Sequence, residues 1–178
     1  GLRSGHVGIP FTWPAHELAG FAVAGFDAAA RETGMTYPAE LLRELLERFG
    51  PLELDNRFPI GENGHVDLER VQRAAAQKVD LALWLTERSE PDLLFVVFMA
   101  ADHIHHLCWT DWERDGARSP VAEVYRILDR ALGRLLDAIG PEADIVVVSD
   151  HGGGSLNGVV NLNAWLASQG YLEYVPAG

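Results

Sequence analysis

The chain has 178 residues, of which 48% are hydrophobic and 22% are charged, and this composition predicts a globular protein of about one domain. Its 26 acidic and 14 basic residues give a formal net charge of −12, which argues against a nucleic acid duplex or an anionic membrane surface as partner. The longest apolar run, residues 93–101, is too short to span a membrane, and a single cysteine excludes an internal disulfide.

Two short apolar segments come first in the chain, residues 6–11 and 21–26, and both are bounded by Pro or Gly in the way that strands are. Helical spacing of leucines then predicts a helix of about a dozen residues around residues 41–49, which Gly-Pro ends. A second helix is expected from Asp67, a candidate N-cap, to about Ser89.

The second half of the chain predicts a βαβ unit. Residues 92–99 and 144–149 are continuous apolar runs, which indicate strands buried on both faces, as in a parallel sheet. Between them we expect a loop over residues 102–118 and a third helix over residues 119–139. This order favours an α/β domain with a mostly parallel sheet flanked by helices.

The remaining segments complete a single domain. A short helix over residues 161–168 and a terminal strand over residues 171–174 are expected at the end of the chain. Residues 1–178 are therefore interpreted as one α/β domain, with a helical and loop insertion around residues 30–90. No signal peptide is visible, and this favours the cytoplasm. The sequence leaves the oligomeric state open.

Polar motifs follow both apolar runs of the βαβ unit. Asp102 and His106 lie four residues apart, so one helical turn would present both on one side, and Asp150-His151 precedes three glycines. Ligands of open parallel sheets bind beyond the carboxyl ends of the strands. Carboxylate and imidazole groups suit Zn²⁺, Mn²⁺ or Fe²⁺. The two motifs together predict a metal site, although either alone also occurs among surface residues and turns.

Several neighbouring residues are weaker candidates. His103, His105 and Trp109 are expected to line a substrate pocket, or else to be solvent-facing histidines and a packing aromatic. Cys108 is interpreted as a small buried hydrophobe.

These motifs resemble the alkaline phosphatase superfamily, and within it the type I phosphodiesterase/nucleotide pyrophosphatase-like proteins. The resemblance lies in residues 98–109 (FMAADHIHHLCW) and 146–152 (VVVSDHG). Residues 160–172 (VNLNAWLASQGYL) are similar to the NLNxWL…GYL segment of such proteins, and residues 8–14 (GIPFTWP) resemble their VPxTYPP region.

The resemblance implies an alkaline phosphatase-like partial fold and a hydrolase of small-molecule phosphoesters. Such a hydrolase uses two divalent metal ions, for which Zn²⁺ is the preferred identity and Mn²⁺ the alternative. Asp102 and His106 would ligate one ion, and Asp150 and His151 the other. The implied reaction is a two-step, in-line hydrolysis through a phospho-enzyme. The alternatives are a non-catalytic metal- or ligand-binding module, and a sulfatase, phosphonate hydrolase or phosphoglycerate mutase-like member of the superfamily.

The sequence departs from the family pattern at both ends. The Ser or Thr nucleophile and the first Asp ligand of the family come from an earlier strand and helix start, which nothing before His6 matches. The family also uses a further downstream His, and no His follows His151. Because the chain begins with Gly rather than Met, we interpret it as a fragment of a larger metallohydrolase domain, inactive without the missing nucleophile; a degenerate member is the alternative.

Overall fold

The computed structural model describes residues 1–25, 33–53, 59–62 and 64–175. Its elements in chain order are β1 (Ser4–Ile9), β2 (Gly20–Ala24), β3 (Thr36–Tyr37), α1 (Leu41–Phe49), α2 (Leu68–Ser89), β4 (Leu93–Val96), α3 (Ala100–Asp115), the 3₁₀ helix η2 (Gly116–Arg118), α4 (Pro120–Ile139) and α5 (Leu162–Ser168). Phe26, the last residue of the second predicted strand, lies outside the described residues. None of the described helices has the length and hydrophobicity needed to cross a membrane.

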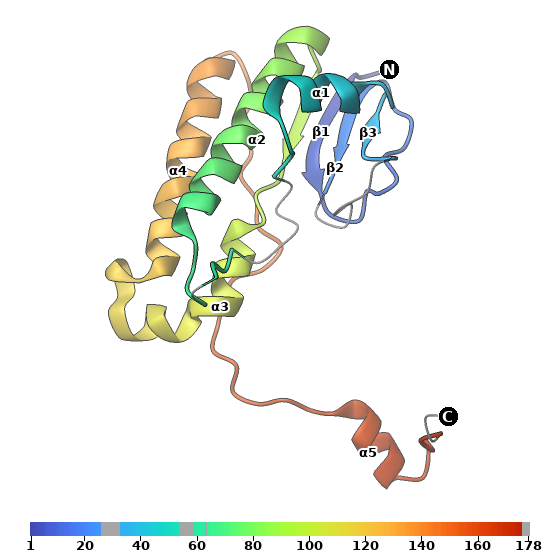
Figure 1. The fold of residues 1–178 in the computed structure, drawn as a ribbon, viewed down its shortest axis with the longest axis vertical. Coiled ribbons are helices and arrows are strands. Elements are labelled where there is room, and N and C mark those ends of the chain that lie inside the picture. The colour runs from blue at the N-terminus through green and yellow to red at the C-terminus, as the bar shows by residue number, and fades with distance from the viewer. Residues whose placement is uncertain (26–32, 54–58, 63, 176–178) are drawn as a thin grey trace.

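The strands form one mixed sheet in the order β3-β2-β1-β4. β1 pairs in parallel with both β2 and β4, and the short β3 is antiparallel to β2. Helix α2 packs on the sheet, α4 packs along α2, and α3 packs on α4 (Figure 1). The predicted α/β class, with a mostly parallel sheet flanked by helices, is confirmed.

Polar side chains fix the starts of three helices at the predicted positions. The Asp67 carboxylate accepts a hydrogen bond from the Arg70 amide at 2.9 Å, at the start of α2. The Ser119 hydroxyl accepts one from the Ala122 amide at 3.3 Å, at the start of α4. The Asn161 side-chain oxygen accepts a hydrogen bond from the Ala164 amide at 2.9 Å, at the start of α5. Each cap satisfies an amide that has no partner within its helix, so these boundaries are locally encoded.

The core lies between the sheet and the helices. Its fully buried side chains include Val7, Phe21, Val23, Leu45, Val79, Leu85, Ile104 and Val124. Burying one such side chain stabilises the fold by about 1.5–3 kcal/mol. The core therefore joins the two central strands of the described sheet to α1, α2, α3 and α4.

One glycine inside α4 gives a small stability prediction. A Cβ at Gly133 would meet nothing within 4 Å. Gly133→Ala is therefore expected to raise the free energy of unfolding by about 0.5–1 kcal/mol, because Ala loses less backbone entropy in a helix. Urea denaturation measures this change. Gly50→Ala is the control: Gly50 is equally open but has φ 71°, so no gain is expected there. A loss at Gly133 would contradict the prediction.

The prediction that residues 92–99 form a strand buried on both faces is wrong. Only Leu93–Val96 are in β4, and β4 is an edge strand of the described sheet. Leu93 and Phe95 are 46% and 47% exposed, and the Phe95 ring meets the His6 ring edge-on at 5.9 Å. A continuous apolar run reflects β propensity, whereas burial depends on whether another strand pairs on the outer edge.

The predicted loop over residues 102–118 is also wrong, because α3 and η2 occupy it. Ala100, Ile104 and Cys108 are buried at a spacing of four residues and form the face of α3 that points into the core. The polar residues between them include the half-buried Asp102, the buried His103 and the exposed His106, and their density concealed the helical period.

The C-terminal segment differs most from the sequence prediction. Residues 144–149 pair with no strand in the described structure, and Val146, Val147 and Val148 are 81%, 72% and 81% exposed. The predicted βαβ unit therefore lacks its second strand in the described structure. Residues 171–174 are not a strand either. Figure 1 shows the segment descending from the end of α4 to α5, which stands apart from the body. An extended apolar segment becomes a strand only when a partner satisfies its backbone.

Candidate metal centre

Helix α3 brings Asp102 and His106 together directly after β4. The Asp102 Oδ1 and the His106 Nε2 are 3.4 Å apart, one turn along the helix. A cation bonded at about 2.0–2.2 Å to a carboxylate oxygen and an imidazole nitrogen can bridge this separation. The structure thus confirms that the two side chains share one side of a helical turn, and their chemistry fits a divalent cation.

The second pair lies on the extended segment that follows α4. The His151 amide donates to the Asp150 carboxylate at 3.1 Å, and the two side chains approach to 3.6 Å. The His151 Nδ1 lies 3.0 Å from the Gly152 carbonyl oxygen. Because a carbonyl only accepts, Nδ1 carries the proton in this contact, which leaves Nε2 available as the ligand atom.

Electrostatics link the two pairs. The hydrogen bond to the Gly152 carbonyl raises the pKa of His151, and the charges of Asp150 and Asp102 raise it further. The pKa of His105 is lowered by burial first, and the neighbouring His106 and His151 also lower it while Asp102 opposes them. The segment carrying Asp150 and His151 therefore lies within electrostatic reach of α3.

The two pairs nevertheless remain separate sites in this conformation. In the part of the chain that the structure describes, no group of three or more His, Cys, Asp or Glu side chains is arranged to hold one metal ion. Asp150 is 88% exposed, and its segment has no sheet partner. Each pair alone supplies two donor atoms, whereas a protein site for a cation such as Zn²⁺ normally supplies three or four.

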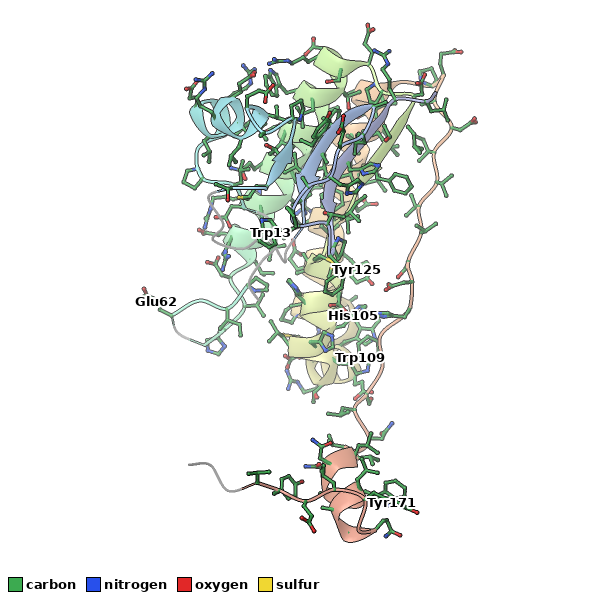
Figure 2. All side chains as sticks on the ribbon, turned by 90° about the vertical axis from the view of Figure 1, so that its right-hand side faces the viewer. Trp13, Glu62, His105, Trp109, Tyr125 and Tyr171 are labelled. Atoms are coloured by element: carbon green, nitrogen blue, oxygen red, sulfur yellow. The ribbon has the colours of Figure 1, made fainter. Side chains whose placement is uncertain are left out.

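The weaker candidates divide between the core and the surface. His103 is buried and lines a small cavity with Arg70 and Ala74 of α2, on a different side of α3 from the surface contacts of His105. His105 stacks on Tyr125 at 5.7 Å between ring centroids, and Trp109 meets His105 edge-on at 5.2 Å. Figure 2 shows His105, Trp109 and Tyr125 grouped beside the C-terminal segment.

Cys108 is buried, as expected for a small hydrophobe. Burial raises the pKa of its thiol, and the nearby Asp111 carboxylate raises it further. The thiol therefore stays protonated at neutral pH and is a poor nucleophile.

Sequence reasoning missed Tyr125 and Glu113. The Tyr125 hydroxyl lies 3.1 Å from the His105 Nε2, and Glu113 accepts a hydrogen bond from the Trp109 indole at 3.2 Å. The i, i+4 spacing of Trp109 and Glu113 was a usable signal once the segment is read as a helix. Nothing local marks Tyr125, because only the packing of α4 on α3 brings it to His105.

Comparison with known proteins identifies a protein family. The family model described as type I phosphodiesterase / nucleotide pyrophosphatase matches residues 11–178, which include both motif pairs. No curated protein and no solved structure matches the chain.

Proposed function

The chain belongs to the type I phosphodiesterase/nucleotide pyrophosphatase family of the alkaline phosphatase superfamily, and from this membership we propose that it supplies two ligand pairs to the active site of a metal-dependent phosphoesterase. The family supports phosphoester hydrolysis as the type of reaction. The observation that carries the metal proposal is the Asp102–His106 pair, whose donor atoms lie 3.4 Å apart on one helical turn.

We assign Asp102 and His106 to one divalent cation, and Asp150 and His151 to a second. Zn²⁺ suits these oxygen and nitrogen donors best, and Mn²⁺ is the second choice. Bound cations would neutralise charge on the phosphoryl oxygens and help to activate a nucleophile. The proposed substrate is a small-molecule phosphoester, since a net charge of −12 disfavours the binding of a nucleic acid duplex.

The chain's own residues orient the donors. Helix α3 fixes Asp102 and His106 relative to each other, because both side chains project from one rigid element. The contact between the His151 Nδ1 and the Gly152 carbonyl selects the tautomer that presents Nε2. A Ser or Thr nucleophile is proposed to come from sequence outside these 178 residues, as the family pattern implies.

Hydrolysis of a chromogenic phosphodiester tests whether this chain supplies metal ligands while the nucleophile comes from outside it. With added Zn²⁺ or Mn²⁺, the 178-residue chain is expected to release product at the background rate. A longer protein that carries the family's nucleophile segment together with this chain is expected to turn the substrate over. Robust turnover by the 178 residues alone would contradict an external nucleophile. Metal binding without turnover by the longer protein would favour a non-catalytic binding module.

A further inference from the structure

Residues 150–155 carry half of the proposed metal site, yet they belong to no helix or strand. We propose that an aromatic cluster on α3 and α4, formed by His105, Trp109 and Tyr125, positions Asp150 and His151 by receiving the backbone of Gly153. The expected effect on metal affinity rests on the proposed function, whereas the contact between Gly153 and the aromatic cluster does not. Figure 2 shows the cluster beside the descending segment.

Gly153 is packed so closely on the cluster that no side chain fits. A Cβ at Gly153 would lie 2.4 Å from the Trp109 Cζ3 and 2.8 Å from the His105 Nδ1. Such distances are far below van der Waals contact, so an added methyl group must displace either the rings or the segment. The neighbouring Gly152 and Gly154 have open space where a Cβ would be. Of the three consecutive glycines, only the middle one would place a Cβ against α3.

The rings are held in place on their far sides. His105 lies against Tyr125, with ring planes inclined by 25° and a 3.1 Å contact between the His105 Nε2 and the Tyr125 hydroxyl. The Trp109 indole donates to Glu113 Oε1 at 3.2 Å and meets His105 nearly perpendicularly. Moving either ring would break one of these contacts. Residues 150–155 are exposed and belong to no helix or strand, so the segment is the part that would move.

A second contact fastens the segment two residues further on. The Ser155 hydroxyl donates to Glu113 Oε1, the same oxygen that accepts from Trp109. Glu113 therefore joins the aromatic cluster to the segment. Two residues of extended chain span at most about 7 Å, so fixing Gly153 confines His151 to the vicinity of α3.

These contacts govern position more than global stability. Residues 150–155 are exposed and contribute nothing to the core, so releasing them leaves the packing of α2, α3 and α4 intact. A ligand pair that is held in place loses less conformational freedom when it binds an ion. Gly153 is thus a positioning residue, and its substitution should alter metal affinity while the fold persists.

The test compares Gly153→Ala with Gly154→Ala in the full chain, by NMR backbone order parameters of residues 150–155 and by Co²⁺ titration followed by absorption. Gly153→Ala is expected to lower the order parameters of this segment and to weaken Co²⁺ binding by about 10- to 100-fold, as substitutions around metal ligands do. Gly154→Ala, which meets no atom, should behave as the unmodified chain, and both variants should keep the same melting temperature.

A second pair of variants tests the inference without the glycine. Glu113→Ala removes the oxygen shared by Trp109 and Ser155 and should lower the order parameters of residues 150–155, whereas Glu113→Gln keeps an acceptor and should leave them near those of the unmodified chain. If the unmodified chain binds no Co²⁺ but Gly153→Ala still lowers the order parameters, the proposed function fails and the positioning contact stands. Equal order parameters and equal Co²⁺ affinity in Gly153→Ala and Gly154→Ala would overturn the inference.

Discussion

Asp102→Ala is expected to weaken the binding of Zn²⁺ or Co²⁺ at α3 by more than about 100-fold. Substitutions that merely surround metal ligands cost about 10- to 100-fold in affinity, and removal of a ligand should exceed that range. The Asp102 Oδ1 lies 3.4 Å from the His106 Nε2, so the variant keeps only one of the two donors of this pair, on a largely exposed imidazole, and one donor binds a cation weakly. Competition titration with a chromogenic chelator measures the change.

The same substitution should lower phosphodiester hydrolysis by the longer, nucleophile-bearing protein by about 10²-fold or more. Metal ions contribute several kcal/mol of charge stabilisation to such reactions, and each 1.4 kcal/mol is about a factor of ten in rate. The loss should persist at saturating substrate, since the missing interaction is one of the transition state. A change in KM alone would contradict the proposed role.

The loss of metal binding in Asp102→Ala can be distinguished from unfolding of the protein. The Asp102–His106 pair lies at the surface, where such ion pairs contribute at most about 1 kcal/mol, so the variant should stay folded in EDTA. Asp111→Asn is a matched control on the same helix, since Asp111 pairs with Arg114 at 2.6 Å and lies outside both ligand pairs. Unchanged metal binding by Asp102→Ala, or an equal loss in Asp111→Asn, would remove Asp102 from the site.

Gly20→Ala should be the most destabilising small substitution in the sheet. Gly20 opens β2 with φ 140°, and a Cβ there would lie 2.1 Å from the Ser4 backbone oxygen. Ser4 is its partner across the β1–β2 ladder, so relief requires the two central strands to separate. Strain and overpacking together predict a loss of about 2–5 kcal/mol in the free energy of unfolding.

Chemical denaturation of Gly20→Ala beside Gly140→Ala isolates the steric part. Gly140 also has a left-handed φ, 84°, but a Cβ there would meet nothing within 4 Å. The control should therefore lose only the conformational cost, about 1–2 kcal/mol. Equal losses in the two variants would show that β1 and β2 do not meet as closely as Ser4 and Gly20 do in the structure.

Local chemistry in the sequence determined the starts of three helices and half of the candidate site. The caps at Asp67, Ser119 and Asn161 act within three residues of themselves, so helix starts could be predicted from the chain alone. The Asp102–His106 pair was predictable for the same reason, because i, i+4 geometry needs only one turn of helix. The motifs also predicted membership of the family, and the match of the family model over residues 11–178 confirms it.

Only the tertiary structure decided which apolar runs are strands in a sheet and which polar residues meet. The runs at residues 93–96 and 144–149 look alike, yet the first pairs with β1 and the second with no described strand, because a ladder requires a partner distant in sequence. Likewise, His105 meets Tyr125 through the packing of α3 on α4, and Gly153 meets Trp109 across more than forty residues of chain. Contacts of this kind depend on how whole elements pack, and no local pattern encodes them.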